Sequence, residues 1–202
     1  MIWPTAKDGL ERIDPIVSGE AGETGVIEPI EPVPTDEATG TAVSNPAFDT
    51  AAWRLMRNQA IEGWVGDPQA VRWLLDYFDV CELFDDMVDG DKPIESAAVE
   101  RALWECLVDM PGNPFFLRYA PRLLPVVSAG INAWLDATAM EREKKDLHWS
   151  YVLRDVYMLV VPAVIEITRG RNYMRAVSAD VTRFFGKETY DEYAAKLAGE
   201  AP

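Results

Sequence analysis

Proline and glycine divide this chain of 202 residues into two parts with different capacities to fold. The first 46 residues contain six prolines and five glycines, and their apolar residues stand singly, without the period of a helix or a strand. Because proline lacks a backbone donor and disfavours helix at the preceding residue, this segment is unsuited to building a core of its own. We therefore expect an extended arm over residues 1–46 and a folded domain over residues 47–202.

The arm is also acidic, with nine acidic residues against two basic ones. Alone in water, such a composition favours a disordered or extended chain. Its spaced apolar side chains are suited to docking in grooves of neighbouring subunits, which would hold the arm in place. The candidate anchors are Ile2, Trp3, Ile13, Ile16, Val17, Val26, Ile27, Ile30 and Val33.

From Phe48 onward, apolar residues recur at helical spacing between clear boundary signals. Gly66-Asp67-Pro68 supplies a break, an N-cap and a proline at the first helical position, and Asn113-Pro114 repeats the last two. The expected helices cover about 49–64, 68–89, 95–110, a stretch after a turn at Pro121 to 143, 146–169 with a kink at Pro162, 173–185 and 190–197. Without a strand pattern, the fold class is all-α: a bundle of about five to seven helices with an extended N-terminal arm.

The net charge of −15 argues against binding to nucleic acid or to an anionic membrane surface, because both need clustered basic residues. The two cysteines, Cys81 and Cys106, stand among apolar helical residues and are expected to be buried thiols. The N-terminus lacks the pattern of a signal peptide, and no stretch reaches the ~18 apolar residues of a membrane span. We therefore expect neither a signal peptide nor a transmembrane segment.

The segment ELFDDMVDGDKP, residues 82–93, contains an Asp-Asp-x-x-Asp pattern made by Asp85, Asp86 and Asp89. On a helical wheel, Asp79, Glu82, Asp86 and Asp89 form one stripe beside an apolar face. Like charges along a helix repel one another, and the negative end of the helix dipole adds to the repulsion. The stripe therefore predicts a compensating cation.

Three interpretations of this stripe compete. It can be a solvated face, or a Mg²⁺ site formed by Asp85, Asp86 and Asp89. It can also be a salt-bridge network whose cation is one of Arg154, Arg101, Arg118 or Lys92. We favour a polar network of Asp79, Glu82, Asp86, His148 and Arg154, with no catalytic residue and no cofactor.

The Mg²⁺ alternative would resemble the isoprenoid-diphosphate synthases, which are all-helical and carry Asp-Asp-x-x-Asp on a core helix. The resemblance implies a metal-dependent enzyme that acts on a phosphorylated small molecule. The second metal motif of the terpene cyclases, Asn-x-x-x-Ser-x-x-x-Glu, is not completed here, because the steps from Asn132 reach Asp136 and Met140.

A second resemblance rests on a series of short motifs. They are Phe84-Asp85-Asp86-x-x-Asp89-Gly90-Asp91-Lys92-Pro93, Pro111-x-Asn113-Pro114-Phe115-Phe116, Trp134, Glu141, His148 and Leu153-Arg154-x-x-Tyr157. Over about residues 67–185 the chain resembles small helical proteins encoded in tailed-bacteriophage genomes. This resemblance implies a viral origin and transfers no catalytic residue.

The combined expectation is a non-enzymatic virion or assembly protein. Its helical body would pack on the particle, and its arm would dock on neighbouring subunits. Its partners would be other virion proteins and copies of itself. It would be located in the virion, after assembly in the host cytoplasm. A regulatory protein of the infected cell remains a further alternative.

Overall fold

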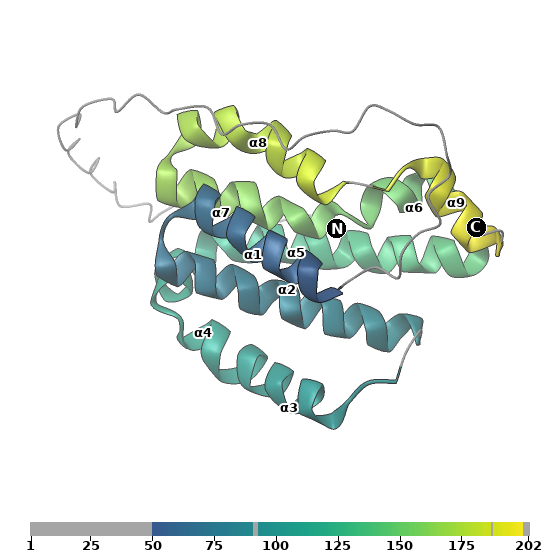
Figure 1. The fold of residues 1–202 in the computed structure, drawn as a ribbon, viewed down its shortest axis with the longest axis horizontal. Coiled ribbons are helices and arrows are strands. Elements are labelled where there is room, and N and C mark those ends of the chain that lie inside the picture. Colours follow the sequence, from purple (N-terminus) through teal and green to yellow (C-terminus); the bar gives the residue numbers. More distant parts are fainter. Residues whose placement is uncertain (1–49, 91–92, 187, 200–202) are drawn as a thin grey trace, which may run out of the picture. The chain divides into compact units, whose positions relative to one another are not determined.

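The computed structural model describes residues 50–90, 93–186 and 188–199, which form helices and contain no strand (Figure 1). The predicted all-α bundle is therefore confirmed, whereas the arm and its candidate anchors lie outside the described residues. The elements are α1 (Thr50–Val65), α2 (Pro68–Asp89), α3 (Ser96–Trp104), a π-helix (Glu105–Asp109), α4 (Met110–Gly112), α5 (Pro114–Glu143), α6 (Leu147–Leu153), a 3-10 helix (Val156–Leu159), α7 (Val160–Arg169), α8 (Arg171–Phe185) and α9 (Tyr190–Ala198).

The boundary signals of α2 and α5 act as the sequence predicts. The Asp67 side chain accepts hydrogen bonds from the backbone N–H groups of Gln69 and Ala70, both at 2.9 Å. Asn113 caps α5 in the same way. Gly90 ends α2 with φ of 69°, a left-handed conformation that glycine adopts without steric cost.

Proline interrupts the helices less than expected around Pro121. Instead of a turn there, α5 runs without a break through Pro121 and Pro125. Each proline removes one helical hydrogen bond and leaves the carbonyl four residues earlier without its donor. Both prolines lie on the exposed side of α5, where water can satisfy those carbonyls.

Two further expected helices differ from the prediction. The helix expected to stop at 110 continues through a π-helix into α4, an irregularity that apolar spacing does not encode. The helix expected over 146–169 divides before Pro162, with α6 and α7 joined through the 3-10 helix. Pro162 provides no N–H for the carbonyl of Met158, so the regular helix begins only just before the proline.

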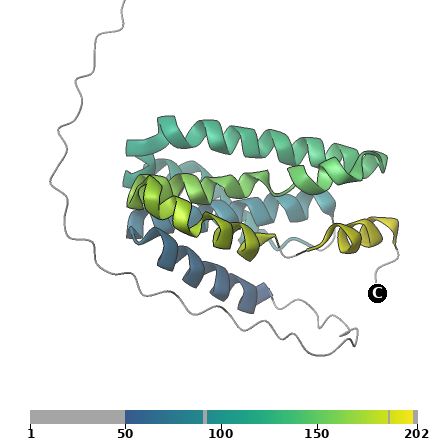
Figure 2. The same cartoon turned by 90° about the horizontal axis from the view of Figure 1, so that it is seen from above.

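The hydrophobic core lies between α1, α2, α5, α7 and α8 (Figure 2). Its fully buried members include Trp73 and Leu74 of α2, Leu123 of α5, and Val161 and Ile165 of α7. Gly130 of α5 allows a close approach to the 3-10 helix, because a Cβ there would lie 2.7 Å from the Cα of Tyr157. This contact places α5 directly against the 3-10 helix.

Helix α5 is also unusually apolar for a helix with so much exposed surface. Among the described residues it is the one helix long and apolar enough to cross a membrane, with a mean hydropathy of 1.2 over an 18-residue window. Core helices of soluble proteins pass the same test, but only 22% of this window is buried. The exposed apolar residues of α5 are therefore a surface property that needs an explanation.

Candidate functional site

Two members of the acidic stripe of α2, Asp79 and Glu82, are paired with arginines of α1. Arg57 is 2% exposed and donates from Nη2 to Asp79 at 2.7 Å and from Nη1 to Glu82 at 2.6 Å. Arg54 adds a second bond to Glu82 at 2.8 Å. The guanidinium of Arg57 also lies 5.6 Å from the ring centre of Phe78. The compensating cations expected for the stripe are therefore present, but they come from α1.

Arg154 and His148, which the sequence assigned to this network, lie elsewhere. Arg154 donates from Nη1 to Glu188 at 3.2 Å, and its guanidinium lies 4.9 Å from the ring centre of Tyr193. His148 is exposed, with its ring 5.5 Å from that of Trp149. Both residues belong to α6 or its end, and α6 packs on α5 and α9. Apolar periodicity could not reveal this arrangement, because it does not say which helices become neighbours.

A buried polar cluster that the sequence did not single out joins α5, α6 and α9. The Ser150 hydroxyl lies 2.6 Å from the Tyr193 hydroxyl and 3.1 Å from Glu141 Oε1. Tyr193 donates to the same Glu141 oxygen at 2.6 Å. Ser150 is fully buried, so a substrate has no access to its hydroxyl. The cluster therefore holds the three helices together.

The Asp-Asp-x-x-Asp residues do not form the cluster of ligands that a metal site needs. Asp85 turns toward α5 and accepts a hydrogen bond from Trp134 Nε1 at 2.9 Å. Within residues 50–90, 93–186 and 188–199, no group of three His, Cys, Asp or Glu side chains is placed to hold a metal ion. The Mg²⁺ alternative therefore gains no support from the geometry of Asp85, Asp86 and Asp89.

Two other carboxylates are buried between α2 and the π-helix. Asp76 is 4% exposed and Glu105 is 6% exposed, and burial raises the pKa of both side chains. Arg72 donates to Asp76 at 3.0 Å and partly opposes the rise of its pKa. The sequence does not indicate this pair, because the local pattern around Glu105 does not reveal the π-helix that carries it.

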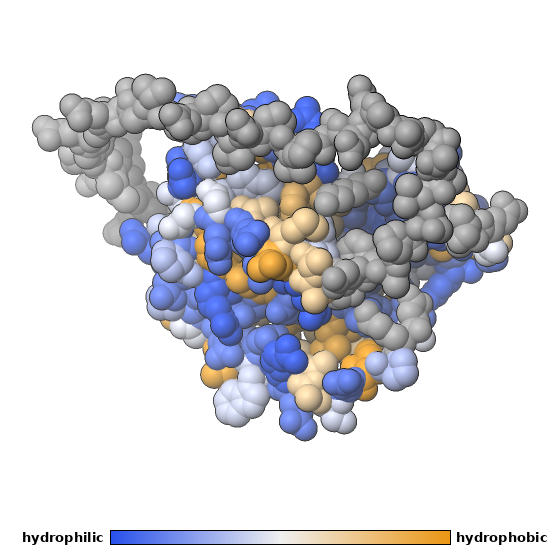
Figure 3. All heavy atoms as spheres, viewed as in Figure 1, coloured by the Kyte–Doolittle hydropathy of each residue, from blue (hydrophilic) through white to orange (hydrophobic). Residues whose placement is uncertain are grey.

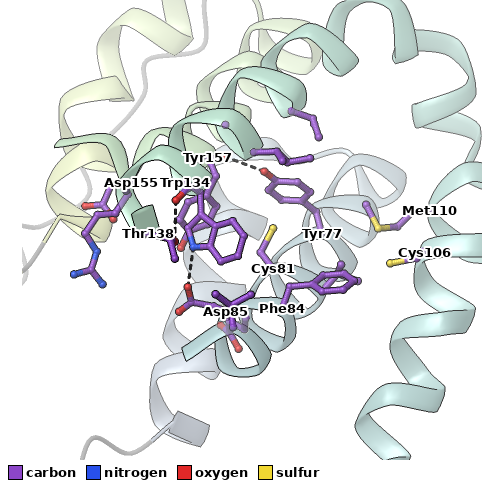
Figure 4. A pocket seen from close by; sticks show the side chains of 18 of the residues that line it. Tyr77, Cys81, Phe84, Asp85, Cys106, Met110, Trp134, Thr138, Asp155 and Tyr157 are labelled. Atoms are coloured by element: carbon purple, nitrogen blue, oxygen red, sulfur yellow. Dashed lines mark hydrogen bonds between the residues drawn. The ribbon is translucent and has the colours of Figure 1, made fainter. Parts of the chain in front are cut away.

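A pocket of about 510 Å³ opens on the other side of α2 (Figure 4). Its walls come from α2, α5, the π-helix with α4, and the 3-10 helix. The volume lies in the range of small-molecule sites, about 300–1,000 Å³. The apolar lining includes Trp73, Phe84, Met110, Phe116, Leu124, Val127, Ile131 and Trp134.

The two cysteines are free thiols that line this pocket, and neither is fully buried in the core. Both line it and both are half-buried. Burial raises the pKa of the Cys81 thiol to about 12, so Cys81 stays protonated and unreactive at neutral pH. Figure 4 shows Cys106 beside Met110 on the opposite wall. We therefore interpret the two thiols as part of the pocket lining rather than as reactive groups.

The polar lining is gathered toward one end of the pocket. Helices α2 and α5 run in the same direction, since Asn113 bonds the Gln69 carbonyl at their beginnings and Arg142 bonds the Val88 carbonyl at their ends. Toward those ends the pocket is lined by Asp85, Asp89, Trp134, Thr138, Glu141, Arg154 and Asp155. The opposite end, near α4, is apolar.

Comparison of the chain with models of known protein families, with curated proteins and with solved structures gives no match.

Proposed function

We propose that this chain is a non-enzymatic structural protein of a tailed-bacteriophage particle, whose helical bundle packs against other particle proteins. The main support is an apolar surface on two segments, with side chains between 48% and 72% exposed. On α3 and the π-helix it comprises Leu103, Trp104, Leu107 and Val108, and on α5 it comprises Leu117, Leu124, Ile131 and Leu135.

The spacing of these residues explains why they form stripes. Leu117, Leu124 and Ile131 are seven residues apart and Leu135 follows four later, so they lie along one side of α5. Figure 3 shows apolar side chains at the surface around α3 and α4, among polar ones. Exposed stripes of large apolar side chains often mark interaction sites on soluble proteins.

The phage part of the proposal rests on the resemblance of residues 67–185 to small helical phage proteins. The charge of −15 supports it indirectly, because such a protein stays soluble before assembly and does not bind the packaged DNA. The arm part rests on the sequence of residues 1–46 alone. Its apolar residues would dock on neighbouring copies or on other virion proteins.

Mass spectrometry of purified particles from the phage that encodes this chain tests the proposal directly. We expect the protein at a fixed copy number per particle, and its absence from pure particles would overturn the proposal. A chain without residues 1–44 should still be made and folded but should be incorporated less.

A pair of variants tests the role of the apolar surface. Trp104→Lys with Leu107→Lys changes two exposed side chains, so folding should be unaffected while incorporation into particles is lost. Leu55→Lys with Met56→Lys is the matched control, because it also adds two lysines at exposed apolar positions, here on α1 and outside both stripes. Equal incorporation of both variants would show that the particle does not use this surface.

The metal-dependent alternative predicts a different protein. It needs Asp85, Asp86 and Asp89 to bind Mg²⁺, and among the described residues no observation favours it over the structural proposal. Its test is thermal unfolding with and without Mg²⁺.

A further inference from the structure

The pocket between α2 and α5 has opposite characters at its two ends. Near α4 it is lined by aromatic and aliphatic side chains such as Phe116, Met110 and Leu124. Toward the ends of α2 and α5 the lining becomes acidic. Figure 4 shows the Met110 wall on one side and Asp85 and Asp155 on the other. A ligand that fits both ends has an apolar body and a polar head.

The charged residues at the polar end determine which charge the ligand's head group should carry. Five carboxylates and one guanidinium line the pocket: Glu82, Asp85, Asp89, Glu141, Asp155 and Arg154. The Arg154 guanidinium is bonded to Glu188 and lies near Glu141 and Asp155, and Glu82 is bonded to Arg54 and Arg57. Asp85 accepts a neutral N–H hydrogen bond from Trp134 at 2.9 Å. Negative charge therefore predominates around the head position.

The backbone adds to this potential. Helix α2 ends there, at Asp89, one turn after Asp85, and the C-terminal end of a helix carries partial negative charge. Helix α5 runs further, to Glu143 (Figure 1). Arg142 lies nearby, does not line the pocket, and donates to the carbonyl of Val88. The fixed charges and the end of α2 therefore favour a cation in the pocket.

The apolar end contains an independent sign of a ligand. Trp73 lines the pocket and is 1% exposed, and its Nε1 is the one buried side-chain nitrogen or oxygen without a hydrogen-bond partner in the described residues. Its ring is held between Tyr77 and Phe116 at centroid distances of 5.7 and 5.4 Å. A buried donor without an acceptor is unfavourable, so a ligand acceptor that reaches Nε1 after a small shift of the surrounding side chains would be favourable.

We propose that this pocket binds a small amphiphilic cation: an elongated apolar molecule with an ammonium-type head near Asp85 and Asp155 and a hydrogen-bond acceptor in its tail. The chain's own arm is a poorer occupant, since its nine acidic residues would meet the carboxylates of the polar end. The proposal concerns a ligand site and does not depend on the virion role.

A titration series with equal tails tests the sign of the head. The full-length protein is titrated calorimetrically with dodecylammonium, dodecanol and dodecanoate, each below its micelle concentration, and with tetramethylammonium as a head without a tail. We expect saturable binding of one dodecylammonium, at least about tenfold tighter than dodecanol, a difference of about 1.4 kcal/mol. Equal affinity for the three heads, or no saturable binding, would overturn the proposal.

Neutral variants locate the head. In the double variant Asp85→Asn with Asp155→Asn, the preference for ammonium over alcohol should fall to less than about threefold, since the charge attraction is removed. Asparagine keeps the oxygen that accepts from Trp134, so the local contact survives. Asp136→Asn removes one charge from an exposed position of α5 outside the pocket and should keep the preference. Retention of the preference in the double variant contradicts the proposed head position.

Two matched tryptophan substitutions locate the tail. Leu124→Trp enlarges a residue of the pocket lining and should weaken binding of dodecylammonium and dodecanol alike. Leu117→Trp, seven residues earlier on the same stripe and outside the lining, should leave binding unchanged. Equal effects of the two substitutions would place the ligand on the outer surface and overturn the proposal.

The Trp73 donor is tested with a tail that ends in a hydroxyl group. The 12-hydroxydodecylammonium ion should bind more tightly than dodecylammonium to the wild type, and the advantage should disappear in Trp73→Phe. The comparison is made within each protein, so a general loss of affinity cancels. An equal advantage in both proteins would show that Trp73 does not bind the acceptor.

Discussion

The two sides of α2 carry the same kind of side chain in different surroundings. On the side facing α1, Asp79 and Glu82 are paired with a nearly inaccessible arginine at 2.6–2.7 Å. On the pocket side, Asp85 receives one neutral hydrogen bond and faces an apolar cavity. The residues are neighbours in sequence, yet only the first side has its charges neutralised by arginines of the adjoining helix.

This difference shows what decides the role of a carboxylate in a bundle. The helix wheel places an acidic residue on one face, but the next helix determines whether that face meets a cation. Helix α1 presents Arg54 and Arg57, so the ion pairs on the first side hold α1 against α2. The pocket side of α5 presents Trp134, so Asp85 meets a neutral donor there instead of a cation.

The largest expected effect comes from removing the buried arginine. Arg57→Met should lower the free energy of unfolding by about 3 kcal/mol, because Asp79 and Glu82 are left without their shared partner. Both carboxylates are about 30% exposed, so water compensates part of the loss. Chemical denaturation in urea measures the change.

The neighbouring arginine is the control for this prediction. Arg54 contacts the same Glu82 but is 44% exposed, so Arg54→Met should cost less than about 1 kcal/mol. Similar decreases in the free energy of unfolding for the two variants would mean that Arg57 contributes no more than a surface ion pair. The contrast between the two sides of α2 would then disappear.

The next effect concerns the packing behind the pocket. Gly130→Ala should destabilise the bundle by about 1–3 kcal/mol, since the new Cβ would lie 2.7 Å from the backbone of Tyr157. Gly63→Ala is the control, because nothing lies within 4 Å of a Cβ there and alanine favours helix by about 1 kcal/mol. Thermal unfolding should shift in opposite directions, and equal shifts would show that α5 has room to move away from the 3-10 helix.

The sequence predicted contacts between residues close together in the chain, but not contacts between distant helices. Local signals sufficed for the caps of α2 and α5, because Asp67 and Asn113 bond backbone groups two and three residues away. They did not suffice for Arg57, whose partners lie 22 and 25 residues further along the chain. The pocket depends on several helices at once and on the π-helix, so spacing along one helix could not indicate it.

A smaller effect is expected from the buried carboxylates Asp76 and Glu105. Burial raises the pKa of both, so the folded protein retains protons at pH values where the unfolded chain has released them. Stability from this pair is therefore lost as pH rises from the unfolded carboxyl pKa of about 4 through the raised folded values.

Amide variants should remove that loss. Asp76→Asn with Glu105→Gln should melt at a higher temperature than the wild type near neutral pH, and the difference should shrink as pH falls toward about 4. Asp136→Asn, on the exposed surface of α5, should show no such trend. A constant difference across the pH range would mean that the two carboxylates ionise alike in the folded and unfolded protein.

The smallest expected effect is that of Mg²⁺, which separates the structural proposal from the metal-dependent alternative. A specific ion would stabilise the folded state in a concentration-dependent way, so a metal site would raise the melting temperature. With a net charge of −15, any added salt also reduces repulsion within the chain. Each Mg²⁺ sample is therefore compared with NaCl at the same ionic strength, and the two should melt at the same temperature. A rise specific to Mg²⁺ or Mn²⁺ that disappears in Asp86→Asn would instead assign chemistry to the carboxylates at the end of α2.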